Sequence, residues 1–179
     1  TGVQTCALPI YNANNTIQNC NVFDFFSATI VTNGILVGAN NTVWTISGNR
    51  IYQTGLRTYT TGNTHQGIRV TSGNNHNVTN NRVGYASNTA TGNYAMTGTI
   101  ATRFIAIDLA VATTSASSVQ GNTVTAITLT TSSGAATANG IICGINVTSG
   151  NVNIGSISGN IIGGTSGTNL ITGNPSTTG

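Results

Sequence analysis

The sequence predicts an all-β fold in which short strands recur along the chain and stack as coils. Three observations lead to this prediction. Thr, Asn and Gly supply 33, 25 and 23 of the 179 residues, Lys and Glu are absent, and two short apolar patterns recur. Thr, Val and Ile are β-branched and favour pleated structure, whereas Lys and Glu are strong helix formers. The hydrophobic fraction of 38% is too high for a disordered polar chain.

The first pattern is six residues long: an aliphatic residue, any residue, Gly or Asn, Asn, any residue, and a second aliphatic residue. Gly and Asn adopt left-handed backbone angles at low cost, so the pair predicts a tight corner between two short strands. Successive copies begin 29, 32, 41 and 38 residues apart. The copies are Ile17–Val22, Ile46–Ile51, Val78–Val83, Val119–Val124 and Ile157–Ile162, and the first copy has Cys20 where the others have Asn.

The second pattern lies 11 to 15 residues upstream of each of the last four copies and has the alternation of a short strand. The four strands are Gly34–Val37, Gly67–Val70, Phe104–Ile107 and Gly144–Val147. In each, two aliphatic residues face one way, and we expect Leu36, Arg69, Ala106 and Asn146 to face the other. The irregular spacing predicts coils with insertions that bulge from the stack. These insertions are Thr54–Gln66, Ala86–Arg103 and Thr130–Asn139.

At this point the chain resembles the right-handed parallel β-helix of pectin-lyase-like proteins, and more narrowly the β-helix segments of large exported bacterial surface proteins. The resemblance is carried by ISGNRIYQTG, VTNNRVGYAS, VQGNTVTAI and ISGNIIGG, and it covers about Asn14 to Gly164. It implies three strands per coil, about five repeat units with loop insertions, and an inward asparagine ladder at one turn. The ladder residues would be Asn49, Asn81, Asn122 and Asn160, and Cys20 interrupts their pattern. The resemblance also implies secretion or a cell-surface location, with further coils of the same chain at both ends.

The sequence divides into three parts. Thr1–Ile10 (TGVQTCALPI) resembles the translated read-through of a sequencing adapter, and we exclude it from the fold. We expect residues 11–170 to form the parallel β-helix and residues 171–179 to be a truncated polar tail. No stretch approaches the ~18 apolar residues of a membrane span, and no signal peptide is visible. The pI of about 9.0 comes from five Arg against two Asp without a basic cluster, which argues against nucleic-acid binding.

Asp24 and Asp108 are the only carboxylate side chains, and they belong to different repeat units. Three rungs of ~4.8 Å would separate them by ~14 Å along the axis, whereas the two carboxylates of a glycosidase lie about 5 to 9.5 Å apart. We therefore interpret both as turn or cap residues, with Asp108 following a strand. Two scattered carboxylates cannot hold calcium, and the absence of Lys excludes a P-loop or a Schiff base within this sequence. We expect no catalytic residue, no metal site and no cofactor.

The histidines and cysteines give no sign of a metal or redox site. His65 and His76 have no Cys or acidic residue at metal-ligand spacing, so we expect both to be solvent-facing turn residues. Cys20 and Cys143 form no C-x-x-C pair, and we expect each to pack as a small apolar residue.

One pair of repeat positions suggests a binding surface. Arg50 and Arg82 occupy the same outward position in adjacent units, and Tyr52 and Tyr85 follow them closely. Guanidinium groups suit carboxylates and aromatic faces suit sugar rings, so these four residues predict a site for an acidic glycan. The alternative is that both tyrosines cover the flank of the coil and both arginines are merely solvated.

The leading functional hypothesis is a non-catalytic structural or adhesin-like module of a secreted or cell-surface bacterial protein. Its partner would be an extracellular polysaccharide or a cell-surface glycan. The alternative is part of a carbohydrate-active β-helix, a polysaccharide lyase or hydrolase, whose catalytic coils lie outside this sequence. Ice binding ranks third, because it requires Thr-x-Thr at one phase in every coil. Thr58–Thr60 and Thr128–Thr130 instead fall in or beside the expected insertions.

Overall fold

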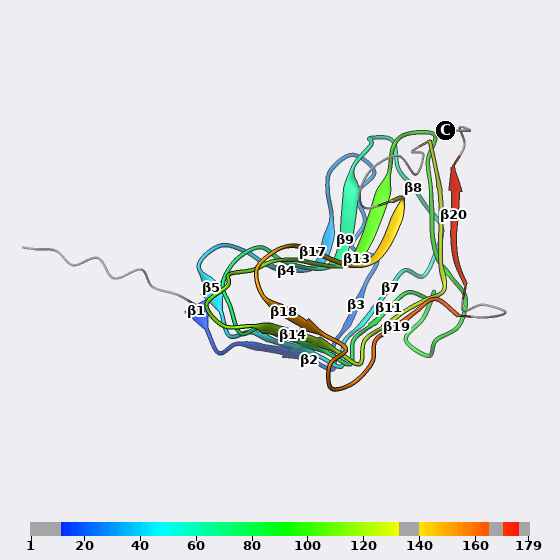
Figure 1. Ribbon diagram of the computed structural model, residues 1–179. Helices are drawn as coiled ribbons and strands as arrows, with labels where there is room; N and C mark the ends of the chain where they lie inside the picture. Colours follow the sequence, from blue (N-terminus) through cyan, green and yellow to red (C-terminus); the bar gives the residue numbers. More distant parts are fainter. Residues whose placement is uncertain (1–11, 133–139, 165–169, 176–179) are drawn as a thin grey trace, which may run out of the picture.

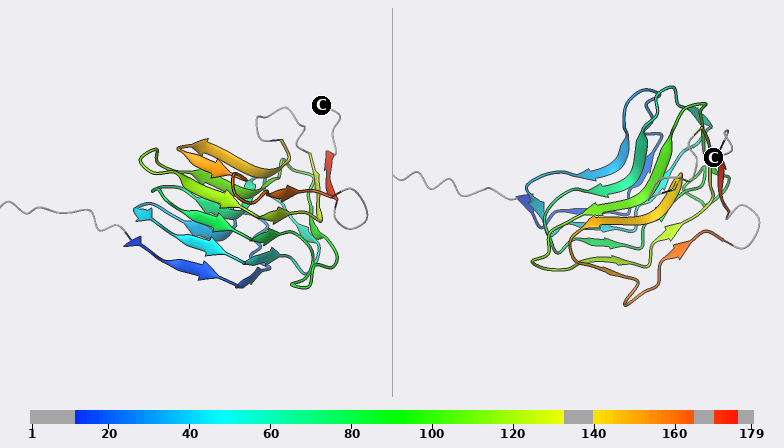
Figure 2. Two further views of the ribbon diagram at one scale, coloured as in Figure 1. Left: turned by 60° about the horizontal axis from the view of Figure 1, so that its bottom comes forward. Right: turned by 45° about the horizontal axis from the view of Figure 1, so that its top comes forward.

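The structure is a computed structural model that describes residues 12–132, 140–164 and 170–175. Within these residues all regular structure is β-strand, and the strands pair in parallel in every sheet (Figure 1). Strands that neighbour one another in a sheet come from successive repeat units, so the chain returns to each sheet once per unit. This all-β, parallel architecture is consistent with a β-solenoid, and Figure 2 shows the strands stacked as successive rungs.

Four sheets and one short strand pair run along the stack, and we number the sheets in the order in which residues 45–70 pass through them. The first sheet contains β2 (Thr16–Gln18), β6 (Thr45–Ser47), β10 (Asn77–Thr79), β14 (Ser117–Gln120) and β18 (Val152–Ile154). The second contains β3 (Asn21–Phe23), β7 (Arg50–Tyr52), β11 (Arg82–Val83), β15 (Thr123–Val124) and β19 (Ile161–Ile162). The third contains β8 (Arg57–Thr58), β12 (Tyr94–Thr97), β16 (Ile127–Thr131) and β20 (Ile171–Pro175). The fourth contains β4 (Asn33–Val37), β9 (Thr64–Val70), β13 (Arg103–Ala110) and β17 (Ile142–Ser149), and β1 (Asn12–Ala13) pairs with β5 (Asn41–Thr42).

The core is made of aliphatic columns that continue from coil to coil. In the first sheet, Ile17, Ile46, Val78, Val119 and Ile154 are paired in register. The three central members are fully buried, whereas Ile154 at one end of the column is 48% exposed. This alignment places the aliphatic side chains of successive coils in contact and removes those of the internal coils from water.

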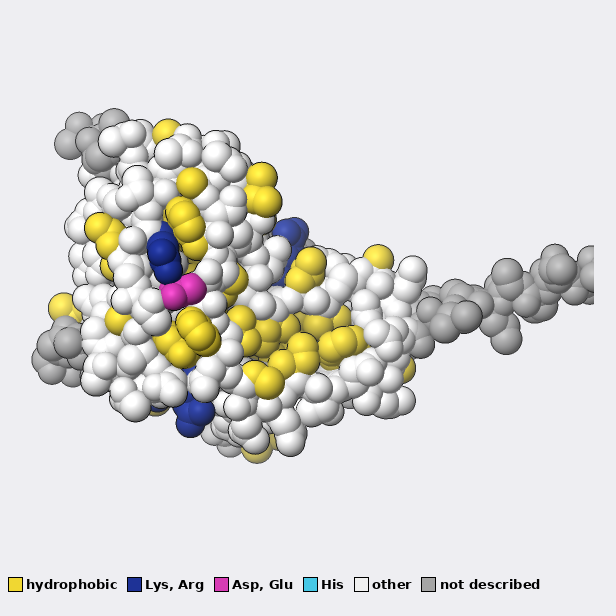
Figure 3. Space-filling model, turned by 180° about the vertical axis from the view of Figure 1, so that it is seen from behind, with side chains coloured by type: hydrophobic (Ala, Val, Ile, Leu, Met, Phe, Trp, Pro, Cys, Tyr) yellow, Lys and Arg dark blue, Asp and Glu magenta, His cyan; other side chains and the backbone are white. Residues whose placement is uncertain are grey.

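Both faces of the stack are open in the part of the chain that the structure describes. The face of the first coil exposes large apolar side chains, which Figure 3 shows gathered in one patch. The opposite face exposes another set of aliphatic side chains. Large apolar side chains exposed in the first coil are Phe23, Ile30, Val31 and Leu36, and those exposed in the last coil are Ile154, Ile157, Ile161, Ile162 and Leu170.

Two of the expected insertions contain strands, so the prediction that they bulge from the stack was wrong. β8 lies in the segment 54–66 and β12 in the segment 86–103, and both pair in the third sheet. Tyr94 and Met96 of β12 are 3% and 1% exposed and alternate with more exposed neighbours. This alternation is only four residues long, and the surrounding Thr, Gly and Ser hide it. Each internal coil therefore passes through four sheets rather than three. Residues 133–139 of the third segment lie outside the described residues.

The fourth sheet is shifted by two residues from the expected alignment of Phe104–Ile107. Ile107 pairs with Ile68 and Asp108 with Arg69, which places Ala106 beside Gly67. That column accepts only small side chains, because a Cβ at Gly67 would lie 2.6 Å from the carbonyl oxygen of Ala106. Asp108 is therefore an internal residue of β13, and its interpretation as a residue that follows the strand was wrong.

The stack extends past the boundary expected at residue 170. Ile171–Pro175, which the sequence analysis assigned to the polar tail, forms β20 and pairs in parallel with β16 from Ile127 to Thr131. β20 is an edge strand of the third sheet, and Pro is tolerated on edge strands because they need not donate every backbone hydrogen bond. Residues 1–11, which include the adapter-like segment, lie outside the described residues.

Candidate functional site

The four predicted ladder asparagines stack at the corner between the first and second sheets. Asn49 Nδ2 donates to Asn81 Oδ1 at 2.9 Å, Asn81 Nδ2 to Asn122 Oδ1 at 3.0 Å, and Asn122 Nδ2 to Asn160 Oδ1 at 2.9 Å. Each Oδ1 also accepts the backbone N–H of the preceding rung; for example, Asn49 N–H donates to Asn81 Oδ1 at 3.0 Å. We call these four residues the asparagine ladder.

The ladder satisfies backbone groups that would otherwise be buried without a partner. The second Nδ2 hydrogen of Asn81 goes to the carbonyl of Ile46 at 2.8 Å, and that of Asn122 goes to the carbonyl of Val78 at 2.8 Å. Asn49 and Asn122 are fully buried and Asn81 is 1% exposed. Burying polar groups is tolerated only when they are hydrogen-bonded, which explains why each internal coil repeats the same residue here.

The ladder has a direction, and its two ends differ. At the first coil, Cys20 keeps the backbone bond, with its N–H donating to Asn49 Oδ1 at 3.0 Å, but its thiol contributes no rung. At the other end, Asn160 Nδ2 donates to the carbonyl of Val119 at 2.9 Å, and no described residue accepts its remaining hydrogen. The thiol of Cys20 is exposed rather than packed, so the expectation that it is a buried apolar residue was wrong.

In the first four coils, the residue before the ladder asparagine, or before Cys20 in the first coil, alternates between Asn and Gly for a steric reason. Asn19, Gly48, Asn80 and Gly121 all have left-handed φ angles between 55° and 66°. A Cβ at Gly48 would lie 2.4 Å from Asn19 Oδ1, and one at Gly121 would lie 2.5 Å from Asn80 Oδ1. The side chain of each Asn therefore lies over the Gly of the next coil, and two bulky residues cannot follow each other there.

The predicted glycan surface is only partly assembled. Arg50 and Arg82 are paired in register in the second sheet, as their phase predicts. Burial lowers the pKa of Arg82, and the like charge of Arg50 lowers it further. Tyr52 and Tyr85 are each only 8% exposed, so neither ring offers an open face.

The open aromatic ring at this surface belongs to a residue that sequence reasoning missed. Phe23 is 52% exposed and stacks on Tyr52 with ring centroids 5.0 Å apart and planes 8° apart. The Tyr85 ring instead lies under the Arg82 guanidinium, whose Cζ is 5.4 Å from the ring centroid. Arg82 Nη2 also donates to the carbonyl of Asn88. The position of Phe23 opposite Tyr52 in the repeat pattern was the signal that could have identified it.

Asp24 is a turn residue, as the sequence analysis expected. It has a φ of 53°, and its carboxylate accepts from the Thr54 N–H at 2.9 Å and the Thr54 hydroxyl at 2.6 Å. Arg57 Nη2 lies 3.1 Å from the same carboxylate. Burial raises the pKa of Asp24, but the bonds from Thr54 and Arg57 outweigh it and leave the pKa below its ordinary 3.8. Asp24 therefore ties the first coil to the second.

Asp108 belongs to an outward-facing column of the fourth sheet, which we call the outer column. Its members, paired in register, are Leu36, Arg69, Asp108 and Asn146. Asn146 Nδ2 donates to Asp108 Oδ1 at 2.8 Å, and Arg69 Nε lies 3.7 Å from Asp108 Oδ2. Cys143 lies in β17, the same strand as Asn146. Burial raises the pKa of its thiol, and the charge of Asp108 raises it further.

Both histidines are buried, so the prediction that they face solvent was wrong. His65 and His76 are 1% and 0% exposed. Each ring accepts a backbone N–H of the preceding coil through Nδ1, at 3.2 Å from Thr32 N and 3.2 Å from Trp44 N. Their positions near turns suggested exposure, but the rings point inward to satisfy these donors.

The two Thr-x-Thr segments lie partly within the third sheet. Thr58, Thr97 and Thr130 are paired in register, contrary to the expectation that they fall among irregular insertions. The pattern is still incomplete. In β12 the position paired with Thr128 holds Ala95, and in β20 the position paired with Thr130 holds Asn174. The condition of Thr-x-Thr at one phase in every coil is not met.

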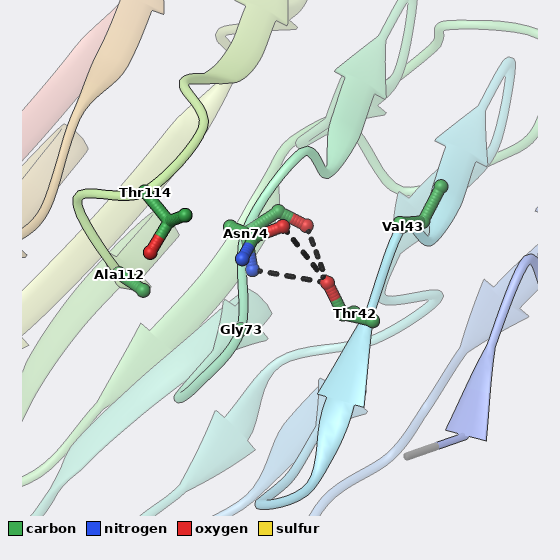
Figure 4. Close-up of a pocket in the computed structure, with 6 residues that line it drawn as sticks. All are labelled: Thr42, Val43, Gly73, Asn74, Ala112 and Thr114. Carbon is green, nitrogen blue, oxygen red and sulfur yellow. Dashed lines mark hydrogen bonds between the residues drawn. The ribbon is translucent and has the colours of Figure 1, made fainter.

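A shallow hollow of about 500 Å³ opens beside the turn that follows the fourth sheet. Figure 4 shows its small, uncharged lining, and the Thr42 hydroxyl donates to the Asn74 carbonyl at 3.0 Å. The lining residues are Thr42, Val43, Gly73, Asn74, Ala112 and Thr114. Thr42 and Asn74 already bond each other, and the six lining residues include no group suited to acid–base chemistry.

No protein-family model, curated protein or solved structure matches the chain. Among the residues that the structure describes, no three His, Cys, Asp or Glu side chains come together as metal ligands would. The same residues contain no helix able to cross a membrane. The described residues thus form a buried polar ladder inside a stack whose few charged side chains lie on separate surfaces.

Proposed function

We propose that this chain is a non-catalytic structural or adhesin-like module of a secreted or cell-surface bacterial protein, folded as a right-handed parallel β-helix of about five units. The observation that carries the proposal is the engagement of both carboxylates. Asp24 is held by Thr54 and Arg57, and Asp108 by Arg69 and Asn146. The acid–base pair of a glycosidase needs two carboxyl groups facing one substrate, and these two are tied to different partners, Asp24 in a turn and Asp108 within β13 of the fourth sheet.

The right hand of the helix follows from a general rule and not from the ladder itself. Parallel strands joined by a crossover within one sheet are almost always connected in the right-handed sense, because the strand twist favours it. The repeat count follows from the five strands in each of the first two sheets. The first four copies of the six-residue pattern supply one strand to each of these sheets, whereas the fifth copy supplies only β19, because β18 ends at Ile154, before the copy begins at Ile157.

A module of this kind would continue a longer stack of coils, as the resemblance to exported proteins implies. The free hydrogen of Asn160 Nδ2 and the exposed aliphatic side chains around it would meet a further Asn-bearing coil. The first coil differs, because Cys20 cannot extend the ladder to a preceding Asn. We propose that the ladder ends at this coil, so that whatever covers its apolar face uses other contacts.

Incubation with pectin, alginate and neutral polysaccharides tests the absence of catalysis. We expect no release of oligosaccharide from any of them and no new unsaturated or reducing ends. The Asp108→Asn and Asp24→Asn variants should behave as the unmodified chain does. Product release that either substitution abolishes would overturn the proposal and identify the carboxylate responsible.

A second candidate function, binding of an acidic glycan, rests on the paired guanidinium groups of Arg50 and Arg82 beside the exposed ring of Phe23. Two cations in adjacent coils repel each other, and a bound carboxylate would relieve that repulsion. This surface would also serve the alternative in which the chain is part of a polysaccharide lyase or hydrolase whose catalytic coils lie elsewhere.

Titration with oligogalacturonate at low ionic strength tests this surface. We expect Arg50→Ala and Phe23→Ala to weaken binding about tenfold each, while Arg103→Ala, on the fourth sheet, leaves it unchanged. Equal binding by all three variants, or no binding by the unmodified chain, would exclude the site.

A further inference from the structure

The two histidines use their rings in the same way that the ladder uses its amides. In each case a side-chain acceptor reaches the backbone N–H of the preceding coil, 32 or 33 residues earlier. The amide oxygen of Asn accepts a hydrogen bond at every pH at which the chain is folded, because an amide does not titrate there. The Nδ1 atom of imidazole can no longer accept once it has bound a proton. The two contacts made by histidine therefore depend on pH, whereas those of the asparagine ladder do not.

We propose that His65 and His76 form an acid-sensitive clasp that holds the N-terminal coils to the stack and releases them when the rings are protonated. His65 joins the second coil to Thr32 of the first, and His76 joins the start of the third coil to Trp44 of the second. The sequence contains two histidines, so the coils from β13 onward contain none. Release is therefore confined to one end of the stack.

His76 has no alternative partner when protonated. Its Nδ1 accepts the Trp44 N–H at 3.2 Å, and its Nε2 lies 2.9 Å from the carbonyl of Ser72 and donates to it. A proton on Nδ1 would place two donors opposite each other inside a fully buried site. The Trp44 N–H cannot reverse its role, so one of the two groups must move away.

His65 is held less symmetrically. Its Nδ1 accepts the Thr32 N–H at 3.2 Å and contacts the Thr32 hydroxyl at 2.8 Å, while its ring lies 4.2 Å from that of Tyr59. Since Nδ1 is an acceptor, the proton resides on Nε2, which has no hydrogen-bond partner among the described residues. The hydroxyl can turn to accept from a protonated ring, but the backbone N–H cannot.

No carboxylate faces either ring to stabilise a positive charge. His65 packs against Tyr59 and Thr32, and Phe104 of β13 pairs with it in register. Phe26 packs against Tyr59, and Arg57 lies over the Phe26 ring and pairs with Asp24. Tyr59 is neutral there, because burial raises its pKa to about 12.

The partners of His76 are likewise neutral. They are Ser72, Trp44 and Ser117, whose hydroxyl accepts the His76 backbone N–H at 3.1 Å. The second carboxylate of the chain, Asp108, is engaged by Arg69 and Asn146 in the outer column.

The pH window follows from the direction of the pKa shifts. Burial lowers the pKa of His65 from 6.5 to about 4, and burial also lowers that of His76. The open chain therefore takes up protons first as the pH falls, so the clasp has its full effect above pH 6.5 and loses it between pH 6.5 and about 4. By linkage, His65 alone should raise the equilibrium population of the opened state about 20-fold at pH 5 relative to pH 7. The stability that Asp24 contributes is lost only as the pH falls below the ordinary carboxyl pKa of 3.8, because its pKa in the folded chain is lower still, which separates the two effects.

Hydrogen exchange on the full chain at pH 7.5 and 5.0, corrected for intrinsic rates, tests the location of the opening. We expect protection of the Thr32 and Trp44 amides and of β4 and β6 to fall at least tenfold, while β14, β15 and β16 keep theirs. Trp44 is the single tryptophan, so its fluorescence reports the same transition. Uniform loss in all coils, or no loss, would overturn the proposal.

The His76→Asn variant supplies the matched control, because an Asn Oδ1 can accept the Trp44 N–H as it does in the ladder. We expect this variant to keep protection near Trp44 at pH 5.0, and a double variant with His65→Asn to lose the acid response entirely. If the variants fail to fold, the ring titrations of the two histidines in the unmodified chain decide: values below 6 support the clasp, and values near 6.5 contradict it. An acid response that persists in the folded double variant would also contradict it.

Discussion

Two columns of side chains run along the same stack and obey opposite rules. The asparagine ladder repeats one residue in four successive coils, whereas the outer column holds an apolar, a cationic, an anionic and an amide side chain in turn. Both occupy equivalent positions from coil to coil, so the backbone does not cause the difference. The ladder must satisfy buried backbone groups of its neighbours, and one side chain fits that need. The outer column meets solvent, where several side chains serve equally well.

The contrast indicates where such a scaffold can vary without losing its fold. Inward and corner positions determine how coils stack, and outward positions are free to acquire contacts with other molecules. The ion pair of the outer column is such a variable feature, because the Arg69 side chain is 38% exposed. The strongest test of the contrast compares substitutions in the two columns directly.

Asn81→Ala should have the largest effect. It removes the acceptor of the buried Asn49 N–H and the donor to the Ile46 carbonyl, both inside the stack. Leaving two or more buried groups unsatisfied costs about 3–5 kcal/mol of unfolding free energy in total. Urea denaturation followed by circular dichroism measures it. Asn160→Ala, at the half-exposed end of the ladder, should cost only about 1 kcal/mol because water can replace the lost bonds; equal losses would show that burial does not set the cost.

Gly121→Ala tests the corner beside the ladder. Gly121 has a φ of 63°, and an added Cβ would lie 2.5 Å from Asn80 Oδ1. Strain and the clash together should lower the unfolding free energy by about 1–3 kcal/mol. Asn80→Gly in the same chain should recover part of this loss. Gly163→Ala, where φ is 79° and nothing lies within 4 Å of an added Cβ, is the matched control and should lose only the contribution of strain; a loss there as large as at Gly121 would contradict the steric explanation.

The sequence predicted the corners well because they leave a local signature. An asparagine is required at 49, 81, 122 and 160 for the side-chain hydrogen bonds of the ladder, so the six-residue pattern contains Asn at each of these positions. The third sheet left no such record: the alternation in β12 involves only Tyr94 and Met96, and β8 is two residues long. Length and Thr-rich composition made these segments look like insertions.

The remaining errors concern residues whose environment is set by distant parts of the chain. His65 and His76 lie near turns, and only the preceding coil provides the N–H groups that draw their rings inward. Asp108 was wrongly assigned to a strand end. The register of β13 is set by the close approach of Ala106 to Gly67, and this constraint comes from the neighbouring coil, so the local sequence does not show it. Phe23 was missed because its stacking on Tyr52 depends on the same pairing between coils.

Cys20→Asn should extend the ladder by one rung and have a smaller, stabilising effect. An amide at this position can donate to Asn49 Oδ1, which already accepts the backbone N–H of Cys20. One partly exposed hydrogen bond is worth about 0.5–1 kcal/mol, seen as a higher denaturation midpoint at an unchanged slope. Cys20→Ser, which is small and polar but lacks the amide, should not stabilise the chain. A gain of equal size for Ser would mean that removing the exposed thiol, rather than adding a rung, is responsible.

Asp108→Asn should have the smallest effect, since it removes only the charge of the outer column. The introduced amide oxygen can still accept from Asn146 Nδ2, and the side chain of the lost partner, Arg69, is 38% exposed, although its Nε is buried. Ion pairs of this exposure contribute less than about 1 kcal/mol, and added salt should weaken the contribution further. Denaturation midpoints of the variant and the unmodified chain should therefore converge at high ionic strength. A salt-independent loss comparable with that of Asn81→Ala would mean that the outer column, like the ladder, is constrained by the stacking of the coils, and that its varied side chains are each fitted to their neighbours.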